Sequence, residues 1–238
     1  MKASRPGAGL RAGVAALALG VGVMPVLAQS LPKPARAASS AAAAAAPASA
    51  PASSAAASAY GQRFATVCAA CHGANGRSGT PLTPVLAGQP SLYTITQLFL
   101  FREGRRGDAG MTAIAKTLND DDLRGFSSFV GTLAPVPAPA PDTPPDTARM
   151  AAGRKLAQEH KCVFCHGADF AGGQQVPRIG GQHEAYLKAS LHGFKDGTRP
   201  GYTRAMTEAL NQVPPADLDV LAYFLARVPV ALSAGASK

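Results

Sequence analysis

The sequence predicts an all-α protein built from two tandem copies of one small helical domain. The first observation is an internal repeat, because Cys68-Ala69-Ala70-Cys71-His72-Gly73 recurs as Cys162-Val163-Phe164-Cys165-His166-Gly167. The second is the helical spacing of apolar residues before the first motif, at Tyr60, Phe64 and Val67. The third is that the alternating apolar and polar pattern of strands is nearly absent. Helices joined by glycine-containing loops therefore account for both copies.

The repeat continues beyond the motif and keeps its register through each copy. The equivalent pairs are Gly88-Gln89 with Gly181-Gln182, Tyr93 with Tyr186, Phe101 with Phe194, Gly104 with Gly197, Met111 with Met206, and Phe129 with Phe224. Two copies of one domain explain this agreement better than chance does.

Both motifs are C-x-x-C-H, the pattern of covalent haem c attachment. Two thiols three positions apart lie on one helical turn, where each can add to a haem vinyl group, and the next imidazole is then carried under the iron. The motifs contain all four cysteines of the chain, so no thiol remains for a disulfide or a nucleophile. The sequence therefore predicts two haem c groups, with attachment at Cys68, Cys71, Cys162 and Cys165 and iron ligation by His72 and His166.

The sixth iron ligand decides whether a haem carries electrons or binds a substrate. Met111 and Met206 follow their motif histidines at nearly the same interval, each in a Gly- or Pro-containing loop before the last helix. Because a core methionine has no reason to repeat in register, we predict both as axial ligands, which implies relatively high potentials. Three histidines without equivalents in the first copy are interpreted as exposed surface residues, with ligation as the alternative: His160, His183 and His192.

Pro84 and Pro177 also follow the motif histidines at similar distances. A backbone carbonyl there could accept the hydrogen bond from the second nitrogen of the histidine ring, which would orient the ligand. Ordinary turn prolines are the alternative.

Two other uses of C-x-x-C fit less well. A zinc ribbon needs no histidine after each pair and leaves the methionines unexplained, and a thioredoxin-like redox pair needs a strand, helix and strand setting.

The first copy is predicted to hold three main helices. The first ends in the motif at Cys68, and the second is capped by Ser91 and stops at Gly104. The last helix begins at Asn119-Asp120-Asp121-Asp122, where the helix dipole favours carboxylates.

The second copy is predicted to repeat this order of helices. One helix runs into Cys162, although two extra residues precede this cysteine compared with the first copy. The next helix stops at Gly197, and the last one has Pro214 and Pro215 in its first turn.

Composition divides the chain of 238 residues into six stretches. Residues 1–28 combine a basic start, an apolar stretch and small residues at the end, which predicts an export signal peptide. An uncleaved membrane anchor is the alternative, although the apolar run is short for a spanning helix. The other stretches are a flexible Ala/Ser/Pro-rich leader at 29–58, the first domain at 59–133, a Pro-rich linker at 134–146, the second domain at 147–230 and a tail at 231–238.

The formal net charge of +9 does not indicate a nucleic-acid partner. Lysines and arginines are scattered, and their longest run in the predicted domains is Arg105-Arg106. Basic binding surfaces usually show longer clusters interleaved with aromatic residues. We therefore expect no nucleic-acid partner, and membrane contact only through partner proteins or an uncleaved anchor.

On these residues the chain resembles tandem class I cytochromes c of the cytochrome c4 type, dihaem electron carriers of the bacterial periplasm. The resemblance covers residues 59–133 and 147–230, and its specific part is the duplication of C-x-x-C-H, Gly-Gln, tyrosine and methionine in register. It implies two small helical bundles, each around a covalently bound haem c, and a periplasmic location. The long leader and linker depart from the family and leave open how tightly the two domains dock.

The resemblance implies an electron carrier rather than an enzyme. We expect it to take single electrons from a cytochrome bc complex or a periplasmic dehydrogenase and to pass them to a terminal oxidase or reductase, through small transient interfaces. One alternative is the cytochrome subunit of a flavin- or quinone-dependent dehydrogenase complex. Another is a dihaem peroxidase-like enzyme, which would require a haem iron without its sixth ligand.

Overall fold

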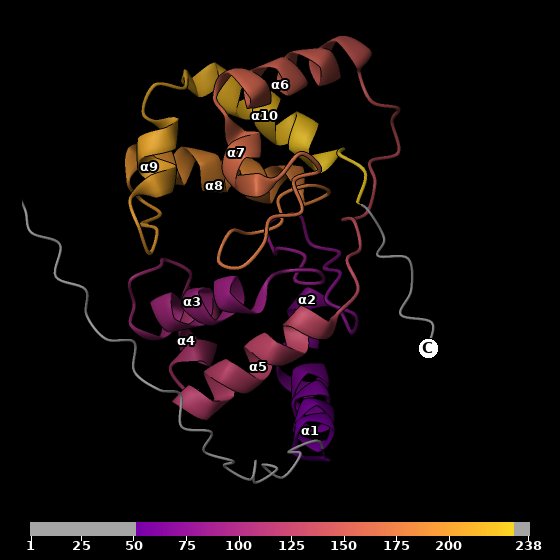
Figure 1. Cartoon of the computed structure of the whole chain (residues 1–238), viewed down its shortest axis with the longest axis vertical. Helices are drawn as coiled ribbons and strands as arrows, with labels where there is room; N and C mark the ends of the chain where they lie inside the picture. Colours follow the sequence, from indigo (N-terminus) through magenta and orange to yellow (C-terminus); the bar gives the residue numbers. More distant parts are fainter. Residues whose placement is uncertain (1–50, 231–238) are drawn as a thin grey trace, which may run out of the picture. The chain divides into compact units, whose positions relative to one another are not determined.

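The computed structural model describes residues 51–230, with side chains from residue 59 onward, and its regular structure there is α-helical (Figure 1). The predicted signal peptide, most of the leader and the tail lie outside the described residues. The all-α prediction is confirmed. Between residues 51 and 230, no helix combines the length and apolarity needed to cross a membrane.

The two halves of the described chain contain the same succession of helices. In the first half they are α1 (Pro51–Val67), α2 (Ala69–His72), α3 (Ser91–Arg102), α4 (Ala109–Ala115) and α5 (Asp120–Thr132). In the second half they are α6 (Thr147–Glu159), α7 (Cys162–His166), α8 (Glu184–Asp196), α9 (Ala205–Leu210) and α10 (Pro215–Ala226).

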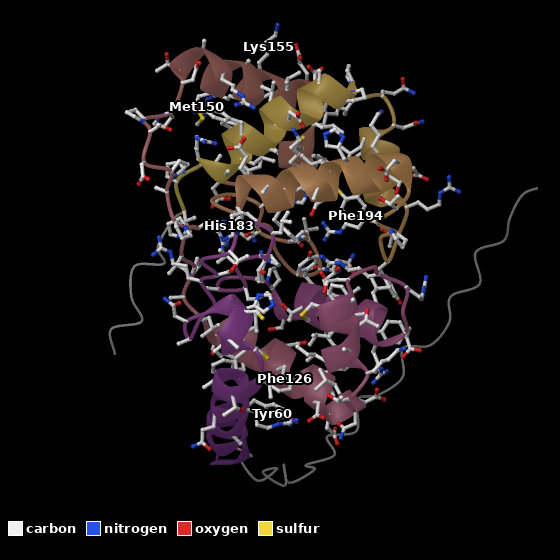
Figure 2. All side chains as sticks on the ribbon, turned by 180° about the vertical axis from the view of Figure 1, so that it is seen from behind. Tyr60, Phe126, Met150, Lys155, His183 and Phe194 are labelled. Carbon is white, nitrogen blue, oxygen red and sulfur yellow. The ribbon has the colours of Figure 1, made fainter. Side chains whose placement is uncertain are left out.

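In the first half, α1 and α3 pack against α5. Their core consists of Phe64, Leu118, Leu123, Phe126 and Val130. Tyr60 on α1 meets Phe126 on α5 edge to face, with ring centroids 5.2 Å apart (Figure 2). The predicted start of α5 is confirmed, because Asn119 and Asp122 form a capping box that satisfies two free backbone N–H groups.

In the second half, α6 and α8 pack against α10. Gly153 on α6 allows the close approach, because a Cβ there would overlap Phe224 of α10. In the first half, a Cβ at Gly61 would likewise lie 2.9 Å from the Phe129 ring. Gly61 and Gly153 are therefore equivalent, yet Cys162 lies two residues further from its glycine than Cys68 does. The two extra residues of the second half are His160 and Lys161, which follow α6, and Lys161 has a left-handed φ of 55°.

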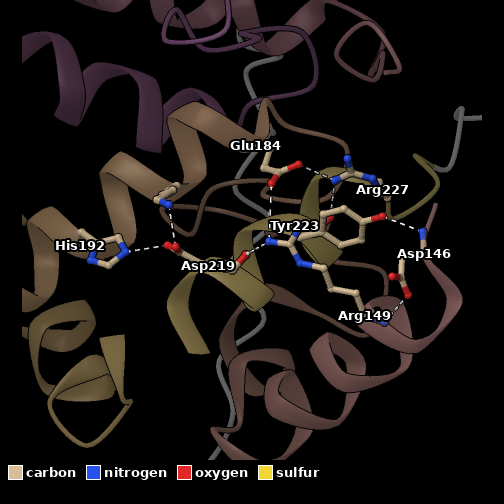
Figure 3. A network of polar contacts seen from close by, with 8 residues as sticks. Asp146, Arg149, Glu184, His192, Asp219, Tyr223 and Arg227 are labelled. Carbon is tan, nitrogen blue, oxygen red and sulfur yellow. Dashed lines mark hydrogen bonds and ion pairs between the residues drawn. The ribbon is translucent and has the colours of Figure 1, made fainter. Parts of the chain in front are cut away.

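A polar network joins the three long helices of the second half (Figure 3). The Asp146 side chain caps α6 by accepting from the Arg149 N–H at 2.9 Å, and the Asp146 N–H donates to the Tyr223 hydroxyl at 2.7 Å. Arg227 donates to the Glu184 carboxylate at 2.6 Å, which ties α10 to α8. Asp219 of α10 also pairs with two residues of α8, Lys188 at 2.6 Å and His192 at 2.8 Å.

Several local predictions were wrong. The first helix begins at Pro51, inside the predicted leader, because proline is tolerated in a first turn and alanine favours helix. Ser91 is the first residue of α3 and does not cap it, since Pro90 occupies the N-cap position. The helix predicted to run into Cys162 ends at Glu159 instead, where the extra residues turn the chain.

The Pro-rich linker makes specific contacts with both halves. The Ala138 N–H donates to the Gly181 carbonyl at 2.7 Å, and Arg77 donates to the Pro137 carbonyl at 2.8 Å. Ala138 is buried together with Val85 and Ala87 of the first half. The linker is therefore fixed by hydrogen bonds and apolar packing. The two halves also contact each other directly, since the Val85 N–H donates to the Gln182 side chain at 2.8 Å.

Candidate haem sites and the contact between them

The two motif histidines lie in equivalent, buried settings. His72 and His166 are each 5% exposed, at the ends of α2 and α7. The Nδ1 atom of His72 lies 2.9 Å from the Pro84 carbonyl oxygen, and that of His166 lies 3.0 Å from the Pro177 carbonyl oxygen. With the proton on Nδ1, each ring donates to its proline carbonyl, and the Nε2 lone pair is left for a metal.

The charge state of these rings suits metal binding. Burial lowers the pKa of both histidines, while the hydrogen bond to the proline carbonyl opposes that shift. The neutral imidazole is therefore favoured at neutral pH, and it is the form that binds iron. The residue after each histidine must be glycine, because Gly73 and Gly167 have φ values of 78° and 81°.

None of the four cysteines takes part in a disulfide, so all four can attach haem. Cys68 and Cys162 are half-buried, whereas Cys71 and Cys165 are exposed. Burial raises the pKa of Cys68 to about 11 and raises that of Cys162 as well, which is the opposite of a redox-active thiol. In the part of the chain that the structure describes, no three His, Cys, Asp or Glu side chains are arranged around a common metal position. The raised pKa values of the Cys68 and Cys162 thiols disfavour the thioredoxin alternative.

Both candidate methionine ligands lie in short helices, so the prediction that they lie in loops was wrong. Met111 is in the first turn of α4, where the Asp108 side chain caps the helix by accepting from the Met111 N–H at 2.8 Å. Met206 is in α9 and packs against the core of the second half. The repeat is thus preserved in secondary structure as well as in sequence.

A cluster of two tyrosines and two arginines, of which Arg106 is buried and the others half-buried, was not predicted from the sequence. The Tyr186 hydroxyl lies 2.9 Å from Arg106 and 3.2 Å from Arg199, and Arg199 also reaches the Tyr93 hydroxyl at 3.4 Å. Burial favours the neutral phenol of Tyr186, but the two guanidinium groups outweigh it and lower its pKa. The repeat could have indicated these arginines, because Arg106 follows Gly104 by two residues and Arg199 follows the equivalent Gly197 by two residues.

The arginines of this cluster suit the acidic groups of a haem. Arg106 is 8% exposed, and none of the ion pairs found among the described side chains involves Arg106 or Arg199. A buried guanidinium group normally needs an anionic partner. Haem c carries two propionates, so the thiols, the imidazoles and these cations together fit the group.

The interpretation of His183 as an exposed surface residue was wrong. It is 8% exposed, and its Nε2 atom lies 2.9 Å from the Ser78 carbonyl oxygen of the first half. His160 and His192 are half-buried, with His160 at the C-cap of α6 and His192 paired to Asp219. A contact between residues so far apart in sequence leaves no trace in helical periodicity.

Comparison with known proteins gives consistent matches across both halves. The sequence profile of the cytochrome c family matches residues 58–134 and 150–228. A cytochrome c4 from Pseudomonas aeruginosa is 31% identical over 173 residues, which are 70% of this chain and 86% of that protein. A protein named thiosulfate dehydrogenase electron acceptor, from Thiomonas intermedia, is 35% identical over 185 residues, which are 73% of this chain and 83% of that protein.

Solved structures agree with these sequence matches. The crystal structure of reduced cytochrome c4 from Pseudomonas stutzeri superimposes with a TM-score of 0.63 at 27% identity, covering 73% of this chain and 98% of that one. A thiosulfate dehydrogenase from Marichromatium purpuratum gives a TM-score of 0.62 at 29% identity, covering 74% of this chain and 41% of that one.

Proposed function

Because the chain belongs to the cytochrome c4-type dihaem cytochromes and carries two covalently bound haem c groups, we propose that it shuttles single electrons between periplasmic redox proteins. Its donor is a cytochrome bc complex or a periplasmic dehydrogenase, and its acceptor is a terminal oxidase or reductase. The observation that carries this proposal is the duplicated histidine setting, in which His72 and His166 each contact a proline carbonyl in the same way.

The proposed roles of the residues follow the repeat. Haem c supplies an iron that changes oxidation state without making or breaking a bond. The four cysteines attach the two groups, the axial ligands are His72 with Met111 and His166 with Met206, and Pro84 and Pro177 orient the histidines. Two fixed protein ligands per iron keep the coordination unchanged and leave no position for a substrate. The buried Arg106 and the half-buried Arg199 would hold the haem propionates by charge.

Partner docking is proposed to occur beside the attachment sites. Phe164, between the cysteines of the second motif, is 88% exposed, and an exposed aromatic side chain is typical of protein contact sites. Electron-transfer complexes bury small areas and dissociate quickly. A single apolar contact of this kind favours brief encounters over a permanent complex.

A thiosulfate dehydrogenase is a specific candidate for the donor. Two relatives, from Thiomonas intermedia and Stutzerimonas stutzeri, bear the name thiosulfate dehydrogenase electron acceptor, and they are 35% and 33% identical to this chain. A thiosulfate dehydrogenase would be one specific case of the periplasmic dehydrogenase proposed as the electron donor.

Stopped-flow spectroscopy tests the proposed function. The oxidised dihaem protein is mixed with a thiosulfate dehydrogenase and thiosulfate, or with a cytochrome bc complex and quinol. The proposal predicts reduction of both haems at a rate proportional to donor concentration, followed by reoxidation when a terminal oxidase is added. Turnover of peroxide by the wild-type protein, with neither donor reducing it, would instead support the peroxidase-like alternative.

A further inference from the structure

Two buried glutamines cross between the halves in a reciprocal arrangement. The Gln182 side chain accepts from the Val85 N–H at 2.8 Å and donates to the Val85 carbonyl at 3.0 Å. The Gln89 side chain accepts from the Arg178 N–H at 3.1 Å and donates to the Arg178 carbonyl at 2.8 Å. Gln89 and Gln182 are 5% and 2% exposed. Because they are equivalent in the repeat, each half receives the same pair of bonds from the other.

Each glutamine binds the peptide group that already holds a motif histidine. Pro84 and Val85 are joined by one peptide group. Its carbonyl oxygen, from Pro84, accepts from the His72 ring, and its N–H, from Val85, donates to Gln182. A continuous path therefore runs from the His72 ring through one peptide group to the Gln182 oxygen. The same path runs from His166 through the peptide group between Pro177 and Arg178 to Gln89.

Hydrogen bonds linked through one peptide group strengthen one another. When the glutamine oxygen accepts from the N–H, the peptide is polarised and its carbonyl becomes a stronger acceptor for the histidine. A stronger bond at Nδ1 makes the imidazole a more basic ligand. A more basic ligand stabilises ferric iron relative to ferrous iron, so this bond lowers the reduction potential.

We propose that Gln89 and Gln182 are positioning residues, each of which sets the strength of the hydrogen bond that orients the histidine ligand in the opposite domain. This inference rests on the proposed ligand roles of His72 and His166. It makes each haem site depend on one side chain from the other domain. The contact between domains thus adjusts both redox centres in addition to holding them together.

The test replaces each glutamine in the full dihaem protein and measures both haem potentials by spectroelectrochemistry. Gln182→Leu removes the acceptor for the Val85 N–H, so the haem held by His72 should be reduced more easily. The expected change in its reduction equilibrium is about threefold, or about 28 mV at 59 mV per tenfold. Gln89→Leu should have the same effect on the haem held by His166. In each variant the potential of the glutamine's own domain should change little.

A second readout identifies which histidine is affected. Exchange of the ring Nδ1–H with solvent, followed by nuclear magnetic resonance on histidine-labelled protein, should accelerate for His72 in Gln182→Leu and for His166 in Gln89→Leu. Gln182→Glu serves as the conservative variant, because it keeps an oxygen acceptor at the same place. It should leave the potential of the His72 haem at or below its wild-type value.

The matched control is His183→Leu, which removes another bond between the halves, that to Ser78, without touching either proline peptide. If the glutamines only hold the domains together, this control and both leucine variants will shift both haems alike, and the proposal is wrong. Equal shifts in Gln182→Leu and Gln182→Glu would also overturn it. Failure of the proposed function would be seen separately, as carbon monoxide binding by the ferrous wild-type protein.

Discussion

The two domains share one histidine setting but differ in the residue next to it. After Pro84 stands Val85, which is fully buried and apolar, whereas after Pro177 stands Arg178, which is 3% exposed. The Arg178 guanidinium donates to the carbonyls of Ala87, Val136 and Gly180, and among the described side chains no carboxylate pairs with it. Burial lowers its pKa to about 10, so it stays charged at neutral pH.

This difference shows how a duplicated domain can acquire two distinct redox centres. The repeat preserves the proposed ligands and the hydrogen bonds of the histidines, while one substitution introduces a buried positive charge directly after Pro177, although its guanidinium also reaches the Ala87 carbonyl of the first domain. A nearby cation favours the less positive, ferrous state. We therefore expect the haem of the second domain to have the higher potential and to hold the electron longer.

The largest effect is expected from removing a methionine ligand. Met111→Ala and Met206→Ala should each open one iron, so that about half of the ferrous haem binds carbon monoxide in either variant. The absorption change on carbon monoxide addition measures this directly. If either variant behaved like the wild type, that methionine would not be a ligand, and the two domains would differ in coordination rather than only in charge.

The next largest effect is on the free energy of unfolding, when alanine replaces the glycine at the tight helix contact of each domain. Gly153→Ala should destabilise the second domain by about 2 kcal/mol, because the new methyl group overlaps the rigid base of the Phe224 side chain. Gly61→Ala should cost less than about 1 kcal/mol, because it meets only the far edge of the Phe129 ring and gains helix propensity. Chemical denaturation of both variants measures the difference, and equal losses would contradict the comparison.

Removing the buried charge should make the two domains more alike. In Arg178→Leu, the reduction equilibrium of the second haem should fall about tenfold, or about 59 mV, and that of the first haem should fall by a smaller factor. Redox titration of the dihaem protein gives both values. A gap between the two potentials that stays as large as in the wild type would show that Arg178 does not cause it.

The smallest effects concern acid stability, to which Asp122 contributes in the first domain and Asp219 in the second. The hydrogen bond from Arg63 lowers the pKa of Asp122, and that from Lys188 lowers the pKa of Asp219. A depressed folded-state pKa contributes stability above the unfolded value of 3.8, and this contribution is lost as pH falls through the folded value. Asp122→Ala, which also loses a capping box, should cost about 1 kcal/mol at pH 7, and Asp219→Ala about half as much.

Denaturation of both aspartate variants at pH 7 and at pH 3 separates these contributions. The differences from the wild type should shrink at the lower pH, because pH 3 lies below the unfolded-state pKa of 3.8, where protonation of the unfolded carboxylates already offsets part of the stabilisation. Losses that stay constant with pH would mean that packing, and not charge, accounts for them.

Much of this account was predictable from the sequence because the evidence is local or repeated. The sequence alone predicted the two C-x-x-C-H motifs, the all-α class, the acidic start of α5 and the helix stops at Gly104 and Gly197. The proline carbonyls were also predicted, because their spacing from the histidines repeats.

The contacts between domains could not be predicted in this way. Gln89, Gln182 and His183 bind backbone groups far away in the sequence, and no helical or strand period encodes such partners. The repeat showed that Gln89 and Gln182 are equivalent, but not that they exchange bonds. The contacts of Arg106 with Tyr186 and of Arg199 with Tyr93 also cross between the domains.

The central claim is that both haems are closed by two protein ligands and carry electrons. Absorption spectra of the oxidised and reduced protein, with a haem-to-protein ratio and a carbon monoxide titration, test it most directly. We predict two haems per chain, the weak far-red band of methionine bound to ferric iron, and no response to carbon monoxide. One haem that binds carbon monoxide in the wild type would contradict the claim and indicate an open, enzyme-like site.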